Sequence, residues 1–287
     1  MKLCAEHFDE YFINRLTRTL KRYKMIKEGE RILVAISGGK DSIALIHALC
    51  RILFGKVDIK AIHIRLGIKD YSNVCLKITT EILNQLDIEH HIVDLKQEYG
   101  FTVDEIVSKL RFRRAPCSIC GLIKRRVLND YALKLKVDKI VTGHTLDDEA
   151  TFLLLNYASG NLDLLSRSGP TAPSKYGILV AKIKPLYEIT ELETATYCKV
   201  NNLKYVESKC PYAEKAPTIA LKDVVNNIEK IRPGFKLHLI RSFNRKIKPA
   251  IKSFYAQLEG ELKFCKICGY PTNATYCAFC RLKRRIL

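Results

Sequence analysis

Apolar residues along this chain occur in two kinds of segment, short continuous runs and longer stretches with helical spacing. Runs of strand length lie at 31–36, 61–66, 90–95 and 139–143, with a further candidate at 179–186. Segments with helical periodicity lie at 43–53, 74–86, 121–136 and 191–202. Strands that alternate with helices predict a parallel sheet covered on both faces. The sequence therefore predicts a doubly wound α/β fold, similar to a Rossmann fold.

Both ends of the chain differ from this central pattern. Residues 1–30 form a basic amphipathic pattern that predicts an N-terminal helix, and residues 261–287 form a separate module with four cysteines. Beyond Cys210 four prolines divide the pattern into short pieces. We expect a main domain at 31–255 between these two ends.

The charge is strongly positive and is concentrated in blocks. Lys and Arg number 49 against 30 Asp and Glu, a formal net charge of +19. Six basic and no acidic residues lie within 15–27, seven and none within 109–126, and eight and none within 230–252. A diffuse solvated charge is the alternative, but blocks of this kind can follow a phosphate backbone. Nucleic acid is the partner that the charge favours.

Eleven cysteines and no apolar leader predict a reducing, cytoplasmic setting in place of a disulfide framework. No apolar run approaches the roughly eighteen residues that a spanning helix needs. We expect a soluble protein with no membrane partner.

The strongest local motif is S-G-G-K-D-S, formed by Ser37, Gly38, Gly39, Lys40, Asp41 and Ser42. It joins a predicted strand to a predicted helix, where glycines let the backbone approach a phosphate and the helix N-terminus offers free N–H groups. Its spacing differs from that of a Walker loop or a dinucleotide-binding loop. A plain strand-to-helix turn is the structural alternative.

A second motif pairs Cys117 with Cys120 just before Lys124, which falls on the same face of a predicted helix. One C-x-x-C pair can be half of a zinc site, a redox dithiol or chance. Cys210 lies in a break of the helical pattern, where a thiolate can turn inward, whereas Cys198 lies in a helical pattern typical of a core residue. Three thiolates would leave one iron of a [4Fe-4S] cluster without a protein ligand.

Polar residues also follow two of the predicted strands. Gly143, Asp147 and Asp148 follow the fourth strand at the sheet edge where the S-G-G-K-D-S loop lies, although both aspartates can instead cap the next helix. His63, near the end of the second strand, would lie beside a nucleotide or serve a structural role. We expect this edge to hold the reaction site.

The C-terminal module has the clearest metal pattern, with two C-x-x-C pairs made by Cys265, Cys268, Cys277 and Cys280. Four thiolates at this spacing predict one tetrahedral, structural Zn²⁺ site, a zinc ribbon. Cys4 and His7 offer only two ligands, which is too few for a stable zinc site.

The S-G-G-K-D-S loop resembles that of the PP-loop ATP pyrophosphatase superfamily. This resemblance implies ATP binding, release of pyrophosphate, and Mg²⁺ held with help from Asp41. The order of the loop, P-C-S-x-C-G, T-G-H-x-L-D-D-E-A and C-P-Y-A is similar to that of TtuA-type tRNA 2-thiouridine synthetases, within the TtcA/TtuA family, over nearly the whole chain. It implies an oxygen-sensitive [4Fe-4S] cluster on Cys117, Cys120 and Cys210, with Lys124 and Asp148 as catalytic residues.

The resemblance implies ATP-dependent tRNA 2-thiolation, in which a uridine, favoured in the T-loop, is adenylated and its carbon-2 oxygen replaced by sulfur. A 2-thiocytidine synthetase and a wobble-uridine thiolase share the loop and cysteines, and a non-catalytic RNA-binding zinc protein is an alternative of another class. The sulfur donor would be a ubiquitin-like thiocarboxylate protein or sulfide, and the resemblance suggests a homodimer. Relatives carry an additional N-terminal C-x2-C pair, so Cys4 and His7 match a remnant of their finger, unless the start lies upstream.

Overall fold

The computed structural model describes residues 3–109, 116–213, 217–256 and 263–286. Its main sheet has six strands in the order β3 (His90–Asp94), β2 (Asp58–Arg65), β1 (Arg31–Ala35), β4 (Lys139–Val141), β6 (Ala181–Ile183) and β5 (Thr171–Ala172). All neighbours are parallel except the short edge strand β5, which is antiparallel to β6. The strand order reverses at β1, so the β1 and β4 ends form the switch point where ligands bind in such sheets.

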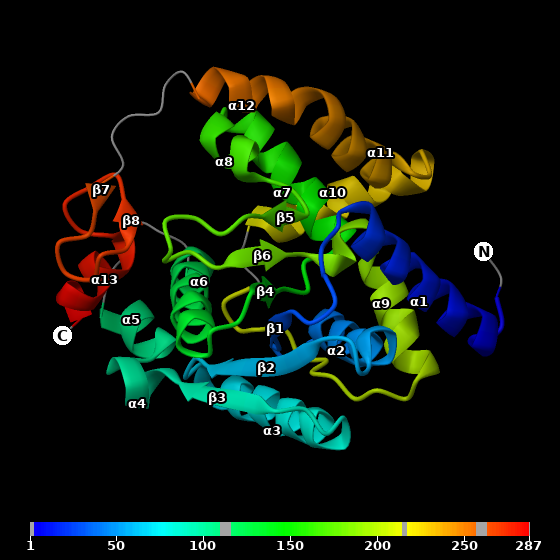
Figure 1. Cartoon of the computed structure of the whole chain (residues 1–287), viewed down its shortest axis with the longest axis horizontal. Coiled ribbons are helices and arrows are strands. Elements are labelled where there is room, and N and C mark those ends of the chain that lie inside the picture. The colour runs from blue at the N-terminus through cyan, green and yellow to red at the C-terminus, as the bar shows by residue number, and fades with distance from the viewer. Residues whose placement is uncertain (1–2, 110–115, 214–216, 257–262, 287) are drawn as a thin grey trace.

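Helices cover both faces of the sheet because its central strands are buried on both sides. In β1, Leu33 belongs to one core and Ile32 and Val34 to the other, as strand alternation requires. The second core includes α1 (Ala5–Arg22), α2 (Lys40–Leu53), α3 (Lys69–Gln85) and α9 (Glu191–Val200), and the first includes α4 (Leu95–Tyr99), α5 (Val103–Lys109) and α6 (Pro116–Lys134). The predicted doubly wound α/β fold is confirmed (Figure 1).

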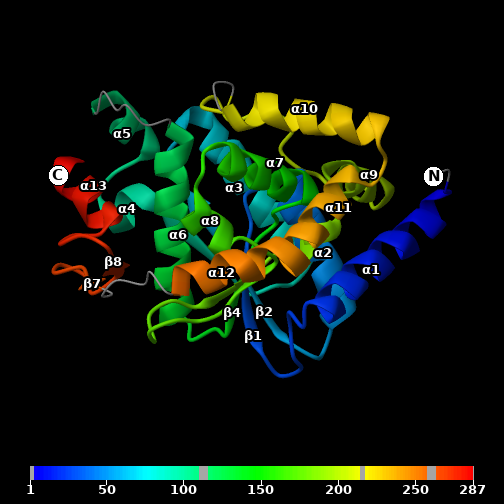
Figure 2. The same cartoon turned by 90° about the horizontal axis from the view of Figure 1, so that it is seen from above.

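A further helical layer lies over the β4 and β6 side of the sheet (Figure 2). It contains α7 (Leu146–Ala158), α8 (Leu162–Arg167), α10 (Pro217–Ile231), α11 (Phe235–Ser242), the π-helical turn η2 (Phe243–Ile247) and α12 (Lys248–Ala256). Sequence alone indicated short pieces here, but α10 alone has 15 residues. Pro217 starts α10 and Pro233 lies between α10 and α11, where the missing N–H costs little, whereas Pro249 is the second residue of α12, directly after the π-helical turn η2. Among the described residues, no helix combines the length and apolarity needed to cross a membrane.

The C-terminal module packs beside α4 to α6, at the opposite end of the molecule from the start of α1 (Figures 1 and 2). It consists of the hairpin β7 (Lys263–Phe264) and β8 (Pro271–Thr272) and of α13 (Ala278–Ile286). The Phe279 ring lies 5.8 Å from Tyr99 and 6.2 Å from Phe101. The module therefore shares a core with the sheet domain.

Two element boundaries differ from the sequence prediction and matter for the site. Only Ala181–Ile183 of the expected strand at 179–186 is extended, because Pro185 starts the 3₁₀ turn η1 (Pro185–Glu188). Helix α6 begins at Pro116, five residues before the predicted start. Cys117 and Cys120 therefore lie on the first turns of a helix.

Candidate active site and metal centres

The S-G-G-K-D-S loop forms a compact turn that ends β1 and starts α2. The hydroxyl of Ser42 accepts from the Ser37 backbone N–H at 3.1 Å and donates to the Gly39 carbonyl at 3.0 Å. Gly39 is the N-cap of α2 and makes no side-chain capping bond. The first N–H groups of α2 therefore remain available to a phosphate.

Two glycines allow neighbouring elements to approach this loop. Gly38 has φ +86°, and a Cβ there would lie 3.2 Å from the Cys75 carbonyl oxygen. A Cβ on Gly143, just after β4, would lie 3.3 Å from the Ser42 backbone nitrogen. Both glycines are required for close approach, and Gly143 lies against the loop as expected from sheet order.

The charged residues of the loop point toward α9. Lys40 Nζ lies 3.0 Å from Asp41 and 3.5 Å from Glu191. Thr194 donates a hydrogen bond to the other Asp41 oxygen. Burial raises the pKa of Asp41 more than Lys40 and Thr194 lower it. Burial opposes the charge on Lys40, but Asp41 and Glu191 raise its pKa. A bound polyphosphate would compete with these carboxylates for Lys40.

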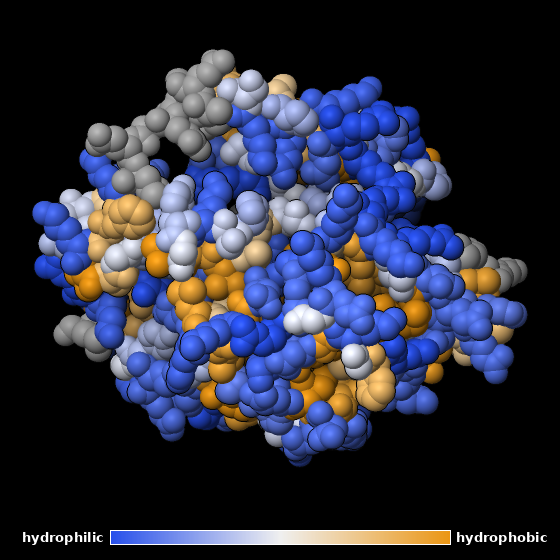
Figure 3. Space-filling model, in the orientation of Figure 1, coloured by the Kyte–Doolittle hydropathy of each residue, from blue (hydrophilic) through white to orange (hydrophobic). Residues whose placement is uncertain are grey.

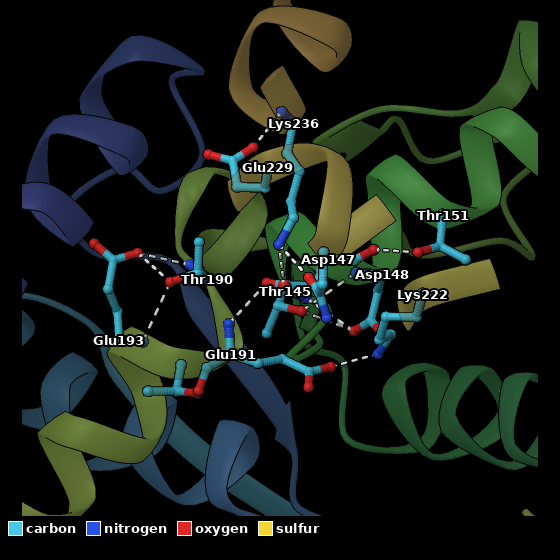
Figure 4. A network of polar contacts seen from close by, with 12 residues as sticks. Thr145, Asp147, Asp148, Thr151, Thr190, Glu191, Glu193, Lys222, Glu229 and Lys236 are labelled. Atoms are coloured by element: carbon cyan, nitrogen blue, oxygen red, sulfur yellow. Dashed lines mark hydrogen bonds and ion pairs between the residues drawn. The ribbon is translucent and has the colours of Figure 1, made fainter. Parts of the chain in front are cut away.

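Asp147 and Asp148, neighbours at the start of α7, have different partners (Figure 4). Asp147 is 4% exposed; its carboxylate accepts from Lys236 Nζ at 2.6 Å and from the Glu191 backbone N–H at 2.8 Å. This carboxylate therefore joins α7, α9 and α11. It is already engaged, which leaves less freedom to bind a cofactor than the sequence prediction assumed.

Asp148 combines helix capping with an ion pair at the site. Its carboxylate accepts from the Thr145 backbone N–H at 3.1 Å, completing a capping box. Lys222 Nζ donates to its other oxygen at 2.6 Å and also contacts Glu191. Burial raises the pKa of Asp148, but Lys222 and the Thr145 N–H lower it overall. Capping and a role in the reaction are thus compatible, and the carboxylate stays ionised.

Lys124 of α6 faces the same edge. Burial lowers the pKa of His63, and the positive charge of Lys124 lowers it further. His63 is 2% exposed and donates from Nδ1 to the Ile36 carbonyl at 2.9 Å, and its buried Nε2 has no partner among the residues that the structure describes. Desolvation by the surrounding protein lowers the pKa of His144, and the positive charges of Lys184 and Lys124 lower it further. Lys124 and two neutral histidines therefore lie within electrostatic reach of one another at this edge.

Cys117, Cys120 and Cys210 are free thiols, and Cys120, Cys210 and Lys124 all lie within electrostatic reach of Cys117. Burial raises the pKa of Cys117, and the nearby Cys120 and Cys210 raise it further. The Cys117 thiol donates to the Tyr212 carbonyl at 3.4 Å, which joins α6 to the segment after Cys210. Among the described residues these three sulfurs do not form a group within 4.8 Å of one another, unlike the C-terminal cysteines. Three thiolates are a donor set that iron-sulfur clusters use. The donor set fits a three-thiolate cluster.

Other cysteines are placed differently. Cys198 is fully buried against α2, and burial raises its pKa to about 12. Cys4 and His7 lie 3.0 Å apart on the exposed start of α1, with no third metal ligand beside them in the described residues. Neither forms part of the site at the sheet edge.

The C-terminal module gathers Cys265, Cys268, Cys277 and Cys280 so that all four sulfurs lie within 4.8 Å of one another. Cys268 and Cys277 are 3.7 Å apart. A Zn–S bond of about 2.3 Å gives a tetrahedral edge of about 3.8 Å, so this spacing suits Zn²⁺. Backbone N–H groups outweigh burial and lower the pKa of Cys265 to about 6, which favours the thiolate a metal needs.

Sequence analysis missed three residues that the fold brings to the loop: Glu191, Thr194 and Lys222. Glu191 lies inside the capping box of Thr190 and Glu193 at the start of α9, and Thr194 directly follows it. A capping box marks where a helix starts but not which other elements the helix will contact. Lys222 gave no signal, because its partners are distant in sequence.

Comparisons with known proteins agree with this arrangement. The PP-loop domain family matches residues 9–215. A tRNA-5-methyluridine(54) 2-sulfurtransferase of Pyrococcus horikoshii is 41% identical over 100% of this chain and 90% of its own length. That of Thermus thermophilus is 39% identical over 98% and 85%.

A solved structure, the U34-tRNA thiolase NcsA from Methanococcus maripaludis with its [4Fe-4S] cluster, matches with a TM-score of 0.82 and 29% identity. The match covers 99% of this chain and 89% of that one. Loop, fold and full-length similarity agree. The chain therefore belongs to the TtuA-type tRNA 2-sulfurtransferases of the PP-loop superfamily.

Proposed function

We propose that this enzyme uses ATP to replace the carbon-2 oxygen of a uridine in the tRNA T-loop with sulfur. The observation that carries the proposal is the convergence of the PP-loop, three free thiols, Lys124 and Asp148 at one sheet edge. The sulfurtransferases with the highest similarity given above are named for uridine 54. The match to the U34 thiolase makes the wobble uridine the second candidate.

ATP would bind with its phosphates on the loop from Ser37 to Ser42. The uncapped start of α2 offers N–H groups, and Lys40 offers a positive charge. Asp41 is the carboxylate best placed to help hold Mg²⁺ beside those phosphates. Gly143 and His63 would lie beside the bound nucleotide. Asp147, paired with Lys236, would support this edge of the site from the protein interior.

Cys117, Cys120 and Cys210 would hold a [4Fe-4S] cluster. A cluster with three protein thiolates supplies an iron that can carry an exogenous sulfide. Helix α6 fixes Cys117 and Cys120. The hydrogen bond from Cys117 to the Tyr212 carbonyl holds the segment that carries Cys210 close by. Lys124, two turns along α6 from Cys117, adds positive charge where anionic sulfur and phosphate would meet.

The reaction balances as two displacements at the base. The carbon-2 oxygen attacks the α-phosphorus of ATP and pyrophosphate leaves; sulfide then bonds to carbon 2, and AMP leaves with the oxygen. Lys124 would stabilise the negative charge that develops on the oxygen and phosphate. Asp148, kept ionised by Lys222, would orient the base or accept its N3 proton.

The remaining features assign partners and parts. The C-terminal cysteines would bind structural Zn²⁺, and we infer three units, 1–30, 31–255 and 261–287. The partners would be tRNA, a second copy of the chain, and a sulfur donor that is either a ubiquitin-like thiocarboxylate protein or sulfide. We place this chemistry in the cytoplasm, as in the relatives named cytoplasmic tRNA 2-thiolation protein 1, from Caenorhabditis elegans for example.

The test is anaerobic reconstitution with iron and sulfide, followed by incubation with ATP and tRNA transcripts that carry a single uridine change at position 54 or 34. Mass spectrometry of the nucleosides should show 2-thiouridine that disappears with the position-54 change. Loss of 2-thiouridine with the position-34 change would favour the wobble uridine as the substrate. Formation of 2-thiocytidine would favour a 2-thiocytidine synthetase. A non-catalytic RNA-binding protein would release no pyrophosphate.

A further inference from the structure

Four cations lie close together near α6: one from α6 itself, one from β6, one from the residue after β6 and one from α12. We name Arg125, Lys182, Lys184 and Lys248 the cation cluster. Asn129 fixes the first contact: its side chain donates to the Ile178 carbonyl at 2.7 Å and accepts from the Val180 N–H at 3.1 Å. This pairing sets α6 beside the start of β6. Arg125, one helical turn before Asn129, thereby comes close to Lys182.

Helix α12 brings the fourth cation to the same place. Gly169 has φ +136°, and a Cβ there would lie 2.7 Å from Lys248 Nζ, so the ammonium lies against the backbone of Gly169. The next residue, Pro170, accepts from the backbone N–H of Lys184 at 2.9 Å. Lys248 and Lys184 are therefore neighbours across a short antiparallel contact, and the surface over the adjoining α11 is strongly hydrophilic (Figure 3).

The protein neutralises the cation cluster only in part. Glu149 is the acidic neighbour, and it is 6% exposed and paired with Lys184 at 2.7 Å. In the described parts of the chain, Arg125, Lys182 and Lys248 form no ion pair or side-chain hydrogen bond. Burial lowers the pKa of Lys182, with Arg125 and Lys184 adding repulsion, and burial with Lys252 and Lys184 lowers that of Lys248 to about 8.

Uncompensated cations at close quarters destabilise a fold, and sites that keep them generally do so for a ligand. The cation cluster is continuous with the reaction site. Arg125 NH1 lies 3.2 Å from the Cβ position of Gly121, directly after Cys120, and Lys184 and Arg125 both act on His144. An anion that neutralises the cation cluster would therefore lie beside the bound nucleotide and the thiols.

We propose that the cation cluster binds phosphodiester groups of the RNA backbone next to the nucleotide that enters the active site. This inference rests on the proposed function, since it assumes an RNA substrate. Separate cations from α6, β6 and α12 suit a chain of single negative charges, because each phosphodiester carries one charge and consecutive groups need consecutive partners. Arg125 adds a planar donor group suited to phosphate oxygens.

The experiment measures tRNA binding by the full chain over a range of salt concentrations, for the parent, Lys182→Met, Lys248→Met and Lys204→Met. Each change removes one positive charge. Lys204 is the matched control, because its ammonium pairs with Glu81 on α3, outside the cation cluster. We expect tRNA affinity to fall about tenfold in the first two variants and the slope of log K against log salt to fall by about 0.7 to 0.9 for each lost contact.

Thermal unfolding separates a ligand role from a structural one. Removing an unpaired cation should leave the melting temperature unchanged or raise it, so weaker tRNA binding in an equally stable variant supports the proposal. Inorganic pyrophosphate, titrated without RNA, is the second arm, because it is another phosphate that this reaction produces. Loss of pyrophosphate binding alone, with tRNA affinity and salt slope unchanged, would overturn the assignment to RNA.

The two proposals fail separately. A parent protein that shows this tRNA binding but forms no thiouridine would overturn the proposed function and keep the cation cluster as an RNA site. A parent that thiolates tRNA, while Lys182→Met and Lys248→Met keep its affinity and salt slope, would overturn the cation cluster alone.

Discussion

Lys222→Met removes the ammonium that links Asp148 to Glu191. In the structure Lys222 Nζ lies 2.6 Å from Asp148 and also contacts Glu191, which in turn lies 3.5 Å from Lys40 (Figure 4). The variant leaves two carboxylates near each other with Lys40 as their nearest cation. Because Met keeps most of the side-chain volume, the effect comes from the lost charge.

The magnitude follows from burial. Breaking a fully buried ion pair costs about 3–5 kcal/mol, but Lys222 and Asp148 are 23% and 24% exposed. A hydrogen bond to a charged group, worth about 1.5–3 kcal/mol, is the better guide here. We expect the free energy of unfolding to fall by about 2 kcal/mol, which lowers the melting temperature by about 5 °C for a chain of this size.

The pH dependence has a definite sign. The pKa of Asp148 is lowered in the folded protein, so its ionised form stabilises the fold above about pH 4 and that contribution is lost as the pH falls through the folded pKa. Without Lys222, burial dominates and the pKa of Asp148 rises. The acid limb of kcat/KM for thiolation should therefore move toward neutral pH in Lys222→Met.

The assays are urea unfolding at pH 7 and steady-state thiolation between pH 5 and 8. Lys222→Arg should restore much of the stability and the parent pH profile, because it restores the charge. Lys230→Met is the matched control on the same helix, since Lys230 bonds Asn227 within α10 and pairs with no carboxylate in the described ranges. A Lys222→Met profile that superimposes on the parent would refute the idea that Lys222 keeps Asp148 ionised for the reaction.

Three further predictions test the other parts of the site. Lys40→Ala should abolish ATP-dependent pyrophosphate release with only a small drop in melting temperature, because its ion pairs with Asp41 and Glu191 are partly exposed; release at the parent rate would exclude the loop. Cys265→Ser should lose zinc but not iron in metal analysis, and joint loss would show that the two centres depend on each other. Cys210→Ser should remove the visible absorbance of a reconstituted cluster while ATP binding persists, whereas Cys198→Ser should keep the cluster and lose at most about 1–3 kcal/mol of stability; the reverse result would exchange the ligand assignment.

The order of strands and the place of the loop could be predicted because both depend on local pattern. The run from Ile32 to Ile36 is apolar throughout, as a strand buried on both faces must be, and it is followed directly by two glycines, of which Gly38 adopts a positive φ. From there the rule that ligands bind at strand ends places Gly143 beside the loop, and the 3.3 Å approach to Ser42 agrees. Short-range signals and sheet geometry were sufficient for this part.

The C-terminal layer could not be predicted in the same way. The pattern beyond Cys210 predicted only short pieces, and it does not say which carboxylates Lys222 and Lys236 will meet. Their partners Asp148 and Asp147 are 74 and 89 positions away in sequence. Such contacts depend on how a whole layer docks, and a pattern within one segment contains no information about that.

Asp147 and Asp148 show how this limit affects the assignment of function. From sequence the two adjacent carboxylates are equivalent, since both follow β4 and both can cap α7. Their side chains nevertheless leave the helix about 100° apart, so one turns to buried Lys236 and the other to the half-open Lys222. A carboxylate 5% exposed and already bound on two sides can hold elements together but cannot readily exchange partners during a reaction. The one that is 24% exposed can exchange a partner, and it also lies within electrostatic reach of His144. Asp148 is therefore the residue whose substitution should change chemistry more than stability, and Asp147 the reverse.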